Sequence, residues 1–550
     1  MGTGSVVIQK IHALLLWLNV FFEYSLIFRG CVAIKNASRT SRLLAAFLDT
    51  DGRNYWGGSL IMRFLGAVAG AVFAAAGWAV RVFCAANENS INKKVFDFLV
   101  KPRGEDGTGF WGFIAKTIHG CAPVRFAKWF FCEDAGNGAG DSAGNGTAII
   151  SLASIFNPKI WYMLFVLGAL TVPSFLWNNM LLLASAVFFA GVFALKWVLE
   201  NDRKKLSFEM ISPALVLFVF FCALSIFTGY GGGDSVRVFV IFFACVVHSV
   251  IAAIVLKDKK YLQIFFLLAA VALVITALFG FFQLFAGIEI REELTDLGVS
   301  PGMSRLYSTM GNPNNDAQAW AMLLPFVLAM AITVKNDTKR LILFGAIALV
   351  VGAFALTYSR SGYVALMAGV GVFVLMSAPR LVPIGLIALV FALPFIPSAI
   401  LERLFTLGQD TSSQYRFLIW EGVRRMLEDF WVQGIGMGPA AFVRIYRSYA
   451  HPLAERALHS HNTFFDILVH SGIGALLAFL AYLFRLFKRG ISDHVAIADR
   501  EQKIYIAAGI AALTVFVVFG VGEYVWFHPR VMLVFWVVAG IVSVRRTSDL

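Results

Sequence analysis

The composition of this 550-residue chain excludes an ordinary soluble protein. Hydrophobic residues make up 59% of it and charged residues only 14%, whereas soluble domains carry about 25% charge. The formal net charge of +13 does not indicate nucleic-acid binding, because the basic residues lie in short loops between apolar runs, as the positive-inside rule expects. Many of these runs are long enough to cross a bilayer core of about 30 Å. An all-α polytopic membrane protein is therefore predicted.

The first 158 residues differ from the rest of the chain. Their apolar stretches are interrupted by polar residues, and the Gly-rich run at 135–147 has the composition of a flexible linker. The stretch at 64–80 either crosses the membrane or lies in its surface as an amphipathic anchor. No signal peptide is expected, because no short apolar block precedes a small-residue cleavage site. We treat residues 1–158 as an N-terminal region whose topology the sequence leaves open.

Residues 159–550 are predicted to form a membrane domain of about twelve transmembrane helices. Basic connections, such as 257–260, 335–340 and 485–503, alternate with less basic ones, so the basic set is assigned to the cytoplasm and the other set to the outside. Prolines inside three spans are tolerable where neighbouring helices satisfy the carbonyls they release; these are Pro173, Pro325 and Pro394. The predicted spans are 160–177, 179–198, 208–228, 236–256, 261–287, 316–334, 341–357, 361–378, 381–398, 462–486, 504–522 and 529–545.

The six cysteines, at positions 31, 84, 121, 132, 222 and 245, show no metal-ligand spacing. Cys222 and Cys245 lie inside apolar runs, where a free thiol behaves as a small hydrophobic side chain. We expect no disulfide framework, no metal site and no cofactor.

The largest outward connection, residues 399–461, is predicted to be a helical extracytoplasmic loop. Apolar residues at helical spacing indicate an amphipathic helix, which the run Gly434–Pro439 ends; a second helical piece with Arg444 follows. A structured loop of this length is typical of a lid or a substrate platform. The apolar residues are Ile419, Trp420, Val423, Met426, Leu427 and Phe430.

The predicted outer loops beyond residue 158 contain Arg but no Lys. One interpretation is chance combined with the positive-inside bias. The other is that the outer face handles a polyanion, which planar, bidentate guanidinium groups recognise better than ammonium groups do.

Arg360 lies between Ser359 and Ser361 at the start of a predicted span. An arginine at the end of a span often has no other role than to extend its charged group to the membrane surface. The functional alternative is anion binding, in which the guanidinium grips a phosphate beside the two hydroxyl groups. Ser361 is then expected to cap the following helix, whose positive end faces the same anion.

His459, His461 and Asn462 lie where the long loop becomes the next span. A histidine at a helix start is often only a structural hydrogen-bonding group. Here the second histidine and several nearby arginines favour a neutral imidazole that accepts a proton in catalysis. Asn462 is expected to cap the helix or to orient a ligand hydroxyl. His470, deeper in the span, is expected to pack or to make a polar contact within the bundle, and His248 is expected to be a core histidine whose hydrogen bonds are satisfied.

The segment 305–316 is rich in turn-forming residues and leads into another span. A proline turn with Asn and Asp capping explains most of it. Arg305 is a candidate for a further phosphate contact.

These motifs, in this order and on one predicted side, resemble the O-antigen ligase and O-antigen polymerase family. The resemblance covers about residues 160–545, and one departure is Ala475, where the family usually has a glycine. The matching motifs are Phe281-Phe282-Gln283, Gly311-Asn312-Pro313-Asn314, Tyr358-Ser359-Arg360-Ser361-Gly362, Gln414-Tyr415-Arg416-Phe417-Leu418-Ile419-Trp420, Gly434-Ile435-Gly436, and His461-Asn462 with Gly472.

The resemblance implies a metal-independent glycosyltransferase with a GT-C-like bundle in the bacterial cytoplasmic membrane. Such an enzyme uses an undecaprenyl-pyrophosphate-linked glycan as donor and an acceptor hydroxyl at the outer face. The family's functional residues fall on Arg360, Arg416 and His461. A ligase and a polymerase differ in their acceptor, which is a lipid, a glycan or another surface polymer. The sequence leaves that choice open. A flippase or transporter of lipid-linked oligosaccharides is the alternative from another class, but it should carry its polar groups at mid-bilayer.

Overall fold

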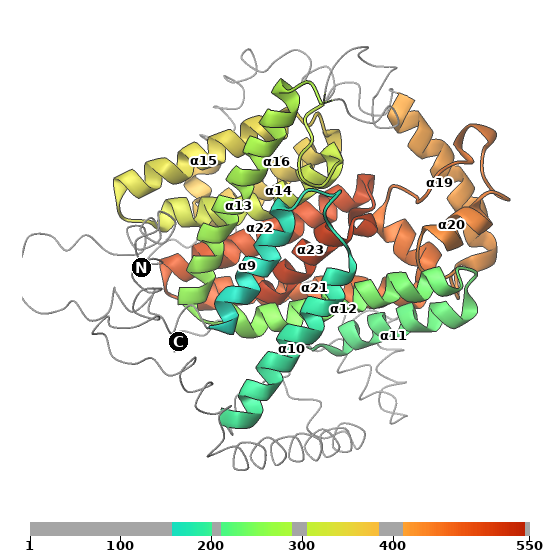
Figure 1. Cartoon of the computed structure of the whole chain (residues 1–550), viewed down its shortest axis with the longest axis horizontal. Helices are drawn as coiled ribbons and strands as arrows, with labels where there is room; N and C mark the ends of the chain where they lie inside the picture. Colours follow the sequence, from blue (N-terminus) through green and yellow to red (C-terminus); the bar gives the residue numbers. More distant parts are fainter. Residues whose placement is uncertain (1–156, 201–210, 289–304, 384–410, 545–550) are drawn as a thin grey trace, which may run out of the picture.

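The computed structural model describes residues 157–200, 211–288, 305–383 and 411–544, and all regular structure in these ranges is helical (Figure 1). The N-terminal region with its linker, and most of the predicted span 381–398 with Pro394, lie outside them. The other eleven predicted spans are α-helices. They are α9 (Pro158–Thr171), α10 (Met180–Glu200), α11 (Pro213–Thr228), α12 (Gly233–Val255), α13 (Lys259–Phe285), α14 (Pro313–Thr333), α15 (Asp337–Ala355), α16 (Arg360–Ser377), α21 (Thr463–Ala496), α22 (Arg500–Gly522) and α23 (Pro529–Ser543).

Seven of these helices are long and apolar enough to cross a membrane: α12, α13, α14, α15, α16, α21 and α22. Four shorter apolar segments, of 10–17 residues, are α9, residues 180–194 of α10, α11 and α23. The prediction that the span 160–177 continues through Pro173 is wrong. That helix ends at Thr171, and Val172 is extended, because the residue before a proline is pushed out of the helical region. Pro325 does lie inside α14, as predicted.

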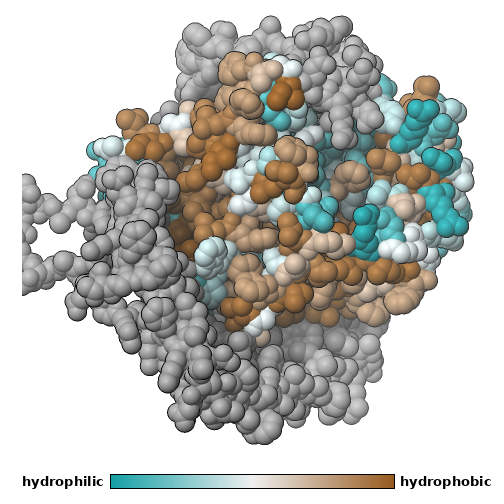
Figure 2. All heavy atoms as spheres, in the orientation of Figure 1, coloured by the Kyte–Doolittle hydropathy of each residue, from teal (hydrophilic) through white to brown (hydrophobic). Residues whose placement is uncertain are grey.

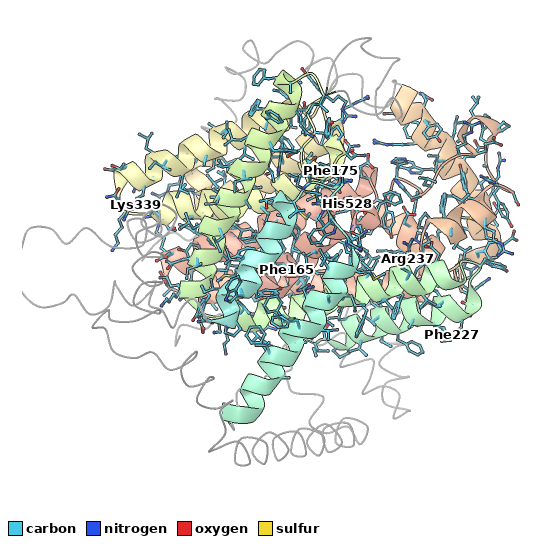
Figure 3. All side chains as sticks on the ribbon, in the orientation of Figure 1. Phe165, Phe175, Phe227, Arg237, Lys339 and His528 are labelled. Carbon is cyan, nitrogen blue, oxygen red and sulfur yellow. The ribbon has the colours of Figure 1, made fainter. Side chains whose placement is uncertain are left out.

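The helices bring the predicted cytoplasmic connections together at one end of the bundle. Lys259 at the start of α13 pairs with Glu501 at the start of α22, with Nζ and Oε2 2.7 Å apart. Tyr505 in the next turn of α22 lies 3.5 Å from the hydroxyl of Thr333 at the end of α14. Figure 3 shows Lys339 at the far end of the molecule from Arg237. Among the described residues, Lys339 of a predicted cytoplasmic connection and Arg237, which follows a predicted outer connection, therefore lie at opposite ends (Figure 3).

Close backbone approach holds the centre of the bundle together. A Cβ atom on Gly540 of α23 would lie 2.3 Å from the carbonyl oxygen of Ser249 in α12. Packing between small residues is a main source of stability in membranes, because lipid tails remove the hydrophobic drive that operates in water. The residues of α23 from Arg530 to Ser543 are all buried, and this helix packs against α9, α12, α14, α21 and α22.

Arg530 fixes the entry to α23. Its side chain is completely buried, and its guanidinium donates to the carbonyl oxygens of Ala169 at 3.0 Å, Thr309 at 3.0 Å and also Val172. The carbonyls of the last turn of a helix have no partner within that helix. Arg530 donates to such carbonyls at the end of α9, and its bond to Thr309 links this helix end to the turn before α14.

Residues 411–461 form a separate helical unit at one side of the bundle, containing α19 (Thr411–Phe430) and α20 (Pro439–Tyr446) (Figure 1). The predicted amphipathic helix is confirmed, and polar surface gathers over this side of the molecule (Figure 2). The unit has its own apolar core, to which α21 contributes Val469. The buried members are Ile419, Val423, Met426, Ile435, Ala441, Phe442, Tyr446, Ala454, Ala457 and Val469.

The helical unit docks into a break in α21. Gly472 has φ 76° and ψ 177°, so the helix is interrupted there. The carbonyl oxygens of Val469 and His470 accept hydrogen bonds from the backbone of Ile435 at 2.9 Å and Gly436 at 3.0 Å. Below the break, the N–H of Ile473 donates to the carbonyl of Trp431 at 2.8 Å. Buried backbone groups must be paired, and here the loop pairs them, which fixes it relative to the bundle.

Candidate functional site

The start of α21 is built by Asn462, as predicted. Its side-chain oxygen accepts from the N–H groups of Phe464 at 2.9 Å and Phe465 at 3.1 Å, which satisfies two of the unpaired donors of a helix N-terminus. Asp466, in the first turn, reaches back and accepts from the hydroxyl of Ser460 at 2.7 Å. The loop carrying His461 is thus bound to the helix on both sides.

His461 has φ 53°, in the left-handed region that non-glycine residues rarely adopt. Its backbone N–H donates to Nδ1 of His459 at 3.1 Å, and the ring of His459 packs against Phe527 with centroids 4.5 Å apart. Tyr358, with φ 50°, is the other described non-glycine residue in this region. Backbone strain of this kind persists where the surroundings impose it, often at functional sites. Both strained residues lie at junctions singled out by the sequence.

Glu523, at the end of α22, gathers three side chains from distant parts of the chain. Its Oε2 lies 3.1 Å from Nδ1 of His461, while its Oε1 accepts from Arg416 of α19 and from the amide of Asn314 in α14 at 3.0 Å. We call these four residues the Glu523 cluster. Glu523 is only 7% exposed, whereas His461 is 27% exposed. A buried carboxylate therefore holds an imidazole that remains accessible.

The charge of Glu523 is maintained by its neighbours. Burial raises its pKa, but Arg416 and His461 lower it further than burial raises it, to about 2. The carboxylate is therefore ionised near neutral pH and accepts the Nδ1 proton of His461. In the tautomer that carries its proton on Nδ1, the imidazole has its lone pair on Nε2, the nitrogen that is available as a base. Burial, and then the nearby His461, lower the pKa of His459 well below its ordinary value, so His459 is uncharged near neutral pH.

A line of polar contacts links the Glu523 cluster to the start of α16. Asn314 accepts from Nη2 of Arg305 at 3.1 Å, and Nε of Arg305 donates to the carbonyl of Thr357 at 2.9 Å. Thr357 is three residues before Arg360. Arg305 thus cross-links the end of α15 to Asn314, a role that the sequence reading did not include.

The two helix ends also meet directly. A Cβ atom on Gly522, next to Glu523, would lie 2.7 Å from the hydroxyl of Ser361. Helices α16 and α22 pack along their length in opposite directions, with Gly369 against Ala511 and Val515. Arg360, 9% exposed, therefore begins α16 at the same end of the bundle as the Glu523 cluster.

One detail of the α16 junction differs from the prediction. The cap residue is Ser359, with extended backbone, and Arg360 is the first helical residue, so Ser361 does not cap the helix. Ser359 makes no side-chain cap hydrogen bond. The helix begins at Arg360, one residue before the predicted start at 361. The hydroxyl of Ser361 faces Gly522 of α22 instead.

The described contact of Arg444 is not with the Glu523 cluster. Its Nη1 donates to the carbonyl of Tyr230 at 3.4 Å, at the junction of α20 with the α11–α12 turn. His248 and His470 are buried in the bundle, as predicted, but Nδ1 of His248 has no hydrogen-bond partner among the described residues, so the prediction of a fully satisfied core histidine is wrong. His248 bonds Ser185 and the carbonyl of Leu182, each at 3.2 Å, and the ring of His470 lies 5.9 Å from that of Tyr524.

Residues 345–480 match the family model described as O-antigen ligase. The resemblance to the O-antigen ligase and polymerase family is confirmed there. A comparison with curated proteins gives no match. The O-antigen ligase segment runs from α15 into α21 and contains Arg360, Arg416 and His461. It indicates a multi-pass, glycosyltransferase-like membrane enzyme of surface-polysaccharide biosynthesis, a role that implies lipid-linked glycans and polymer acceptors.

Sequence reasoning missed Glu523 and Asn314, which lie outside the O-antigen ligase segment. Glu523 lies in the connection between the predicted spans 504–522 and 529–545, and it is an acidic residue directly at the end of an apolar span. That position was the available signal, since an ionisable group at a span boundary needs a partner. Among the described residues, no group of three or more His, Cys, Asp or Glu side chains is placed to hold a metal ion.

Proposed function

We propose that the chain transfers a glycan from undecaprenyl pyrophosphate to an acceptor hydroxyl at the outer face of the bacterial cytoplasmic membrane. In this proposal the bundle has about twelve transmembrane helices, and residues 399–461 form the extracytoplasmic loop. The observation that carries it is the His461–Glu523 pair, joined by Arg416 at the end of the bundle where Arg360 begins α16.

His461 would act as the general base. As the acceptor oxygen attacks the anomeric carbon, its proton passes to Nε2 of His461, and the ionised Glu523 stabilises the imidazolium that forms. The bond between the anomeric carbon and the pyrophosphate oxygen breaks, and the pyrophosphate leaves with the electron pair. A positioned base of this kind contributes about 10²–10⁴-fold to the rate.

Arg360 and Arg416 would stabilise the negative charge that develops on the leaving pyrophosphate. Arginine suits this role because its planar guanidinium donates two parallel hydrogen bonds to phosphate oxygens, and fixed donors aimed at developing charge lower the barrier. The hydroxyls of Ser359 and Ser361 would contact the same anion. Arg305, bonded to Asn314 and Thr357, would position the Glu523 cluster, and a direct phosphate contact from it stays a prediction.

The remaining predicted residues would serve as supports. His459 receives the backbone N–H of His461 and would hold it in its strained conformation. Asn462 is occupied by capping and by the carbonyl of Val521 at 3.0 Å, so we assign it to helix capping. Arg444 lies beside Tyr230, so any contact it makes with substrate would be away from the Glu523 cluster.

The acceptor decides between ligase and polymerase, and both remain within the proposal. Transport is less well supported. A broken helix such as α21 is typical of transporters, where it lines a cavity. Here Ile435 and Gly436 fill the break, and the mid-span His248 is bonded to Ser185 and Leu182.

The test is transfer by the purified protein. We would incubate it with undecaprenyl-pyrophosphate-linked glycan and candidate acceptors, with a metal chelator and without nucleotide, and analyse products by mass spectrometry. The expected result is glycan on the acceptor and an equal amount of undecaprenyl pyrophosphate. Movement of the lipid-linked glycan across proteoliposomes without any transfer would overturn the proposal in favour of a transporter.

A further inference from the structure

Phe417 is the one apolar residue on the exposed face of α19. It is 47% exposed, and every other exposed residue of this helix with a described side chain is polar or charged. Such a face belongs in water rather than among lipid tails. Phe417 is a candidate ligand contact because its ring forms a pair with that of Trp420. The polar and charged residues are Gln414, Glu421, Arg424, Arg425, Glu428 and Asp429.

Phe417 is connected to the Glu523 cluster through a row of aromatic rings. Its ring meets Trp420 edge-on, with centroids 5.6 Å apart, and Trp420 meets Phe465 in the same way at 5.9 Å. The indole N–H of Trp420 donates to the carbonyl of Ser460 at 2.8 Å, directly before His461. The row thus leads from the water-exposed face of α19 to the loop that carries His461.

We infer that Phe417 and Trp420 form a sugar-binding subsite for the glycan of the lipid-linked donor. A pyranose ring presents a face of C–H groups that packs on the electron-rich face of an aromatic ring. The indole N–H of Trp420 is already bonded to the protein, so Trp420 contributes apolar surface. Arg416, which is assigned to the pyrophosphate, lies one helical turn before Trp420 on the same face of α19, and the sugars of the donor begin where the pyrophosphate ends.

This inference rests on the proposed function for the identity of the ligand, and its test is binding rather than turnover. Two probes would be compared in detergent micelles: undecaprenyl pyrophosphate, and the same lipid carrying three β-linked N-acetylglucosamine units. Phe417→Ala should weaken binding of the sugar-bearing probe by about three- to tenfold, the range for loss of one aromatic contact. Binding of the sugarless probe should not change.

Phe417→Tyr, which keeps the ring, should bind both probes as the wild type does. Trp431→Ala is the matched control. Trp431 is also exposed, at 51%, but it directly follows the other end of α19, about 20 Å from Phe417 along the helix axis. Equal weakening of both probes by Phe417→Ala would identify a lipid contact and overturn the inference, as would no weakening of either. A wild type that prefers the sugar-bearing probe yet transfers nothing would reject only the proposed function.

Discussion

The Nδ1 atom of His461 and the Oε2 atom of Glu523 lie 3.1 Å apart, although 62 positions separate the two residues in the chain. The first residue precedes α21 and the second follows α22, so the pairing depends on how these two helices pack. The contact leaves Nε2 of the imidazole as the basic nitrogen. A carboxylate in this position orients the ring and stabilises the charge that the ring acquires.

Glu523→Gln should lower the rate of transfer by about 10²–10⁴-fold, because an amide keeps the shape but no longer provides the negative charge or fixes the tautomer of His461. Initial rates with saturating lipid-linked donor would measure the change. Glu421→Gln is the matched control, since Glu421 is exposed and pairs with Arg425 in the next turn of α19. Equal rates for Glu523→Gln and the wild type would remove Glu523 from the mechanism.

His461→Asn should abolish turnover while donor binding and thermal stability remain close to those of the wild type. Asparagine is chosen because the position has φ 53°, which asparagine tolerates better than alanine does. A loss of about 10²–10⁴-fold corresponds to removal of a positioned base. Donor affinity and the melting temperature in detergent would be measured alongside the rate. Loss of folding together with activity would show that His461 is structural.

Arg360→Lys should reduce transfer at least tenfold with normal expression, since one ammonium group does not reproduce the two parallel donors of a guanidinium. The comparison is with Arg237→Lys in α12, where the arginine is 60% exposed and pairs with Asp234. Arg237→Lys should retain wild-type rates. Full activity of Arg360→Lys would contradict the phosphate-binding role.

The charge of Glu523 should make stability fall at acid pH. Its pKa is lowered to about 2 in the folded protein, against about 4.3 in an unfolded chain, so between these values the unfolded state binds more protons. The contribution of Glu523 to stability is therefore present above about pH 4.3 and is lost as the pH falls towards 2. Melting temperatures between pH 6 and pH 3 should fall more steeply for the wild type than for Glu523→Gln. Parallel curves would contradict this.

Gly472→Ala should detach the 411–461 unit from the bundle. A Cβ atom there would lie 2.0 Å from the carbonyl oxygen of Val432, and the residue has φ 76°, so both the contact and the backbone disfavour alanine. We expect a lower melting temperature and faster proteolysis within residues 411–461. Gly371→Ala in α16 is the control, because nothing lies within 4 Å of its added Cβ and alanine favours the helix.

The sequence alone predicts a helical membrane protein, eleven of its helices, and the positions of Arg360 and His461 at helix starts. Two predicted helix ends are wrong, because α9 stops at Thr171, before the predicted 177, and α21 continues to Ala496, beyond the predicted 486. The features that the sequence predicts are local: apolar length sets a span, and Asn462 caps the helix that follows it in the chain. The grouping of Glu523 and Asn314 with His461 and Arg416 is seen only in the folded chain. Such pairing depends on the packing of α14, α19, α21 and α22, and a polar side chain at a span boundary does not specify its partner across the bundle.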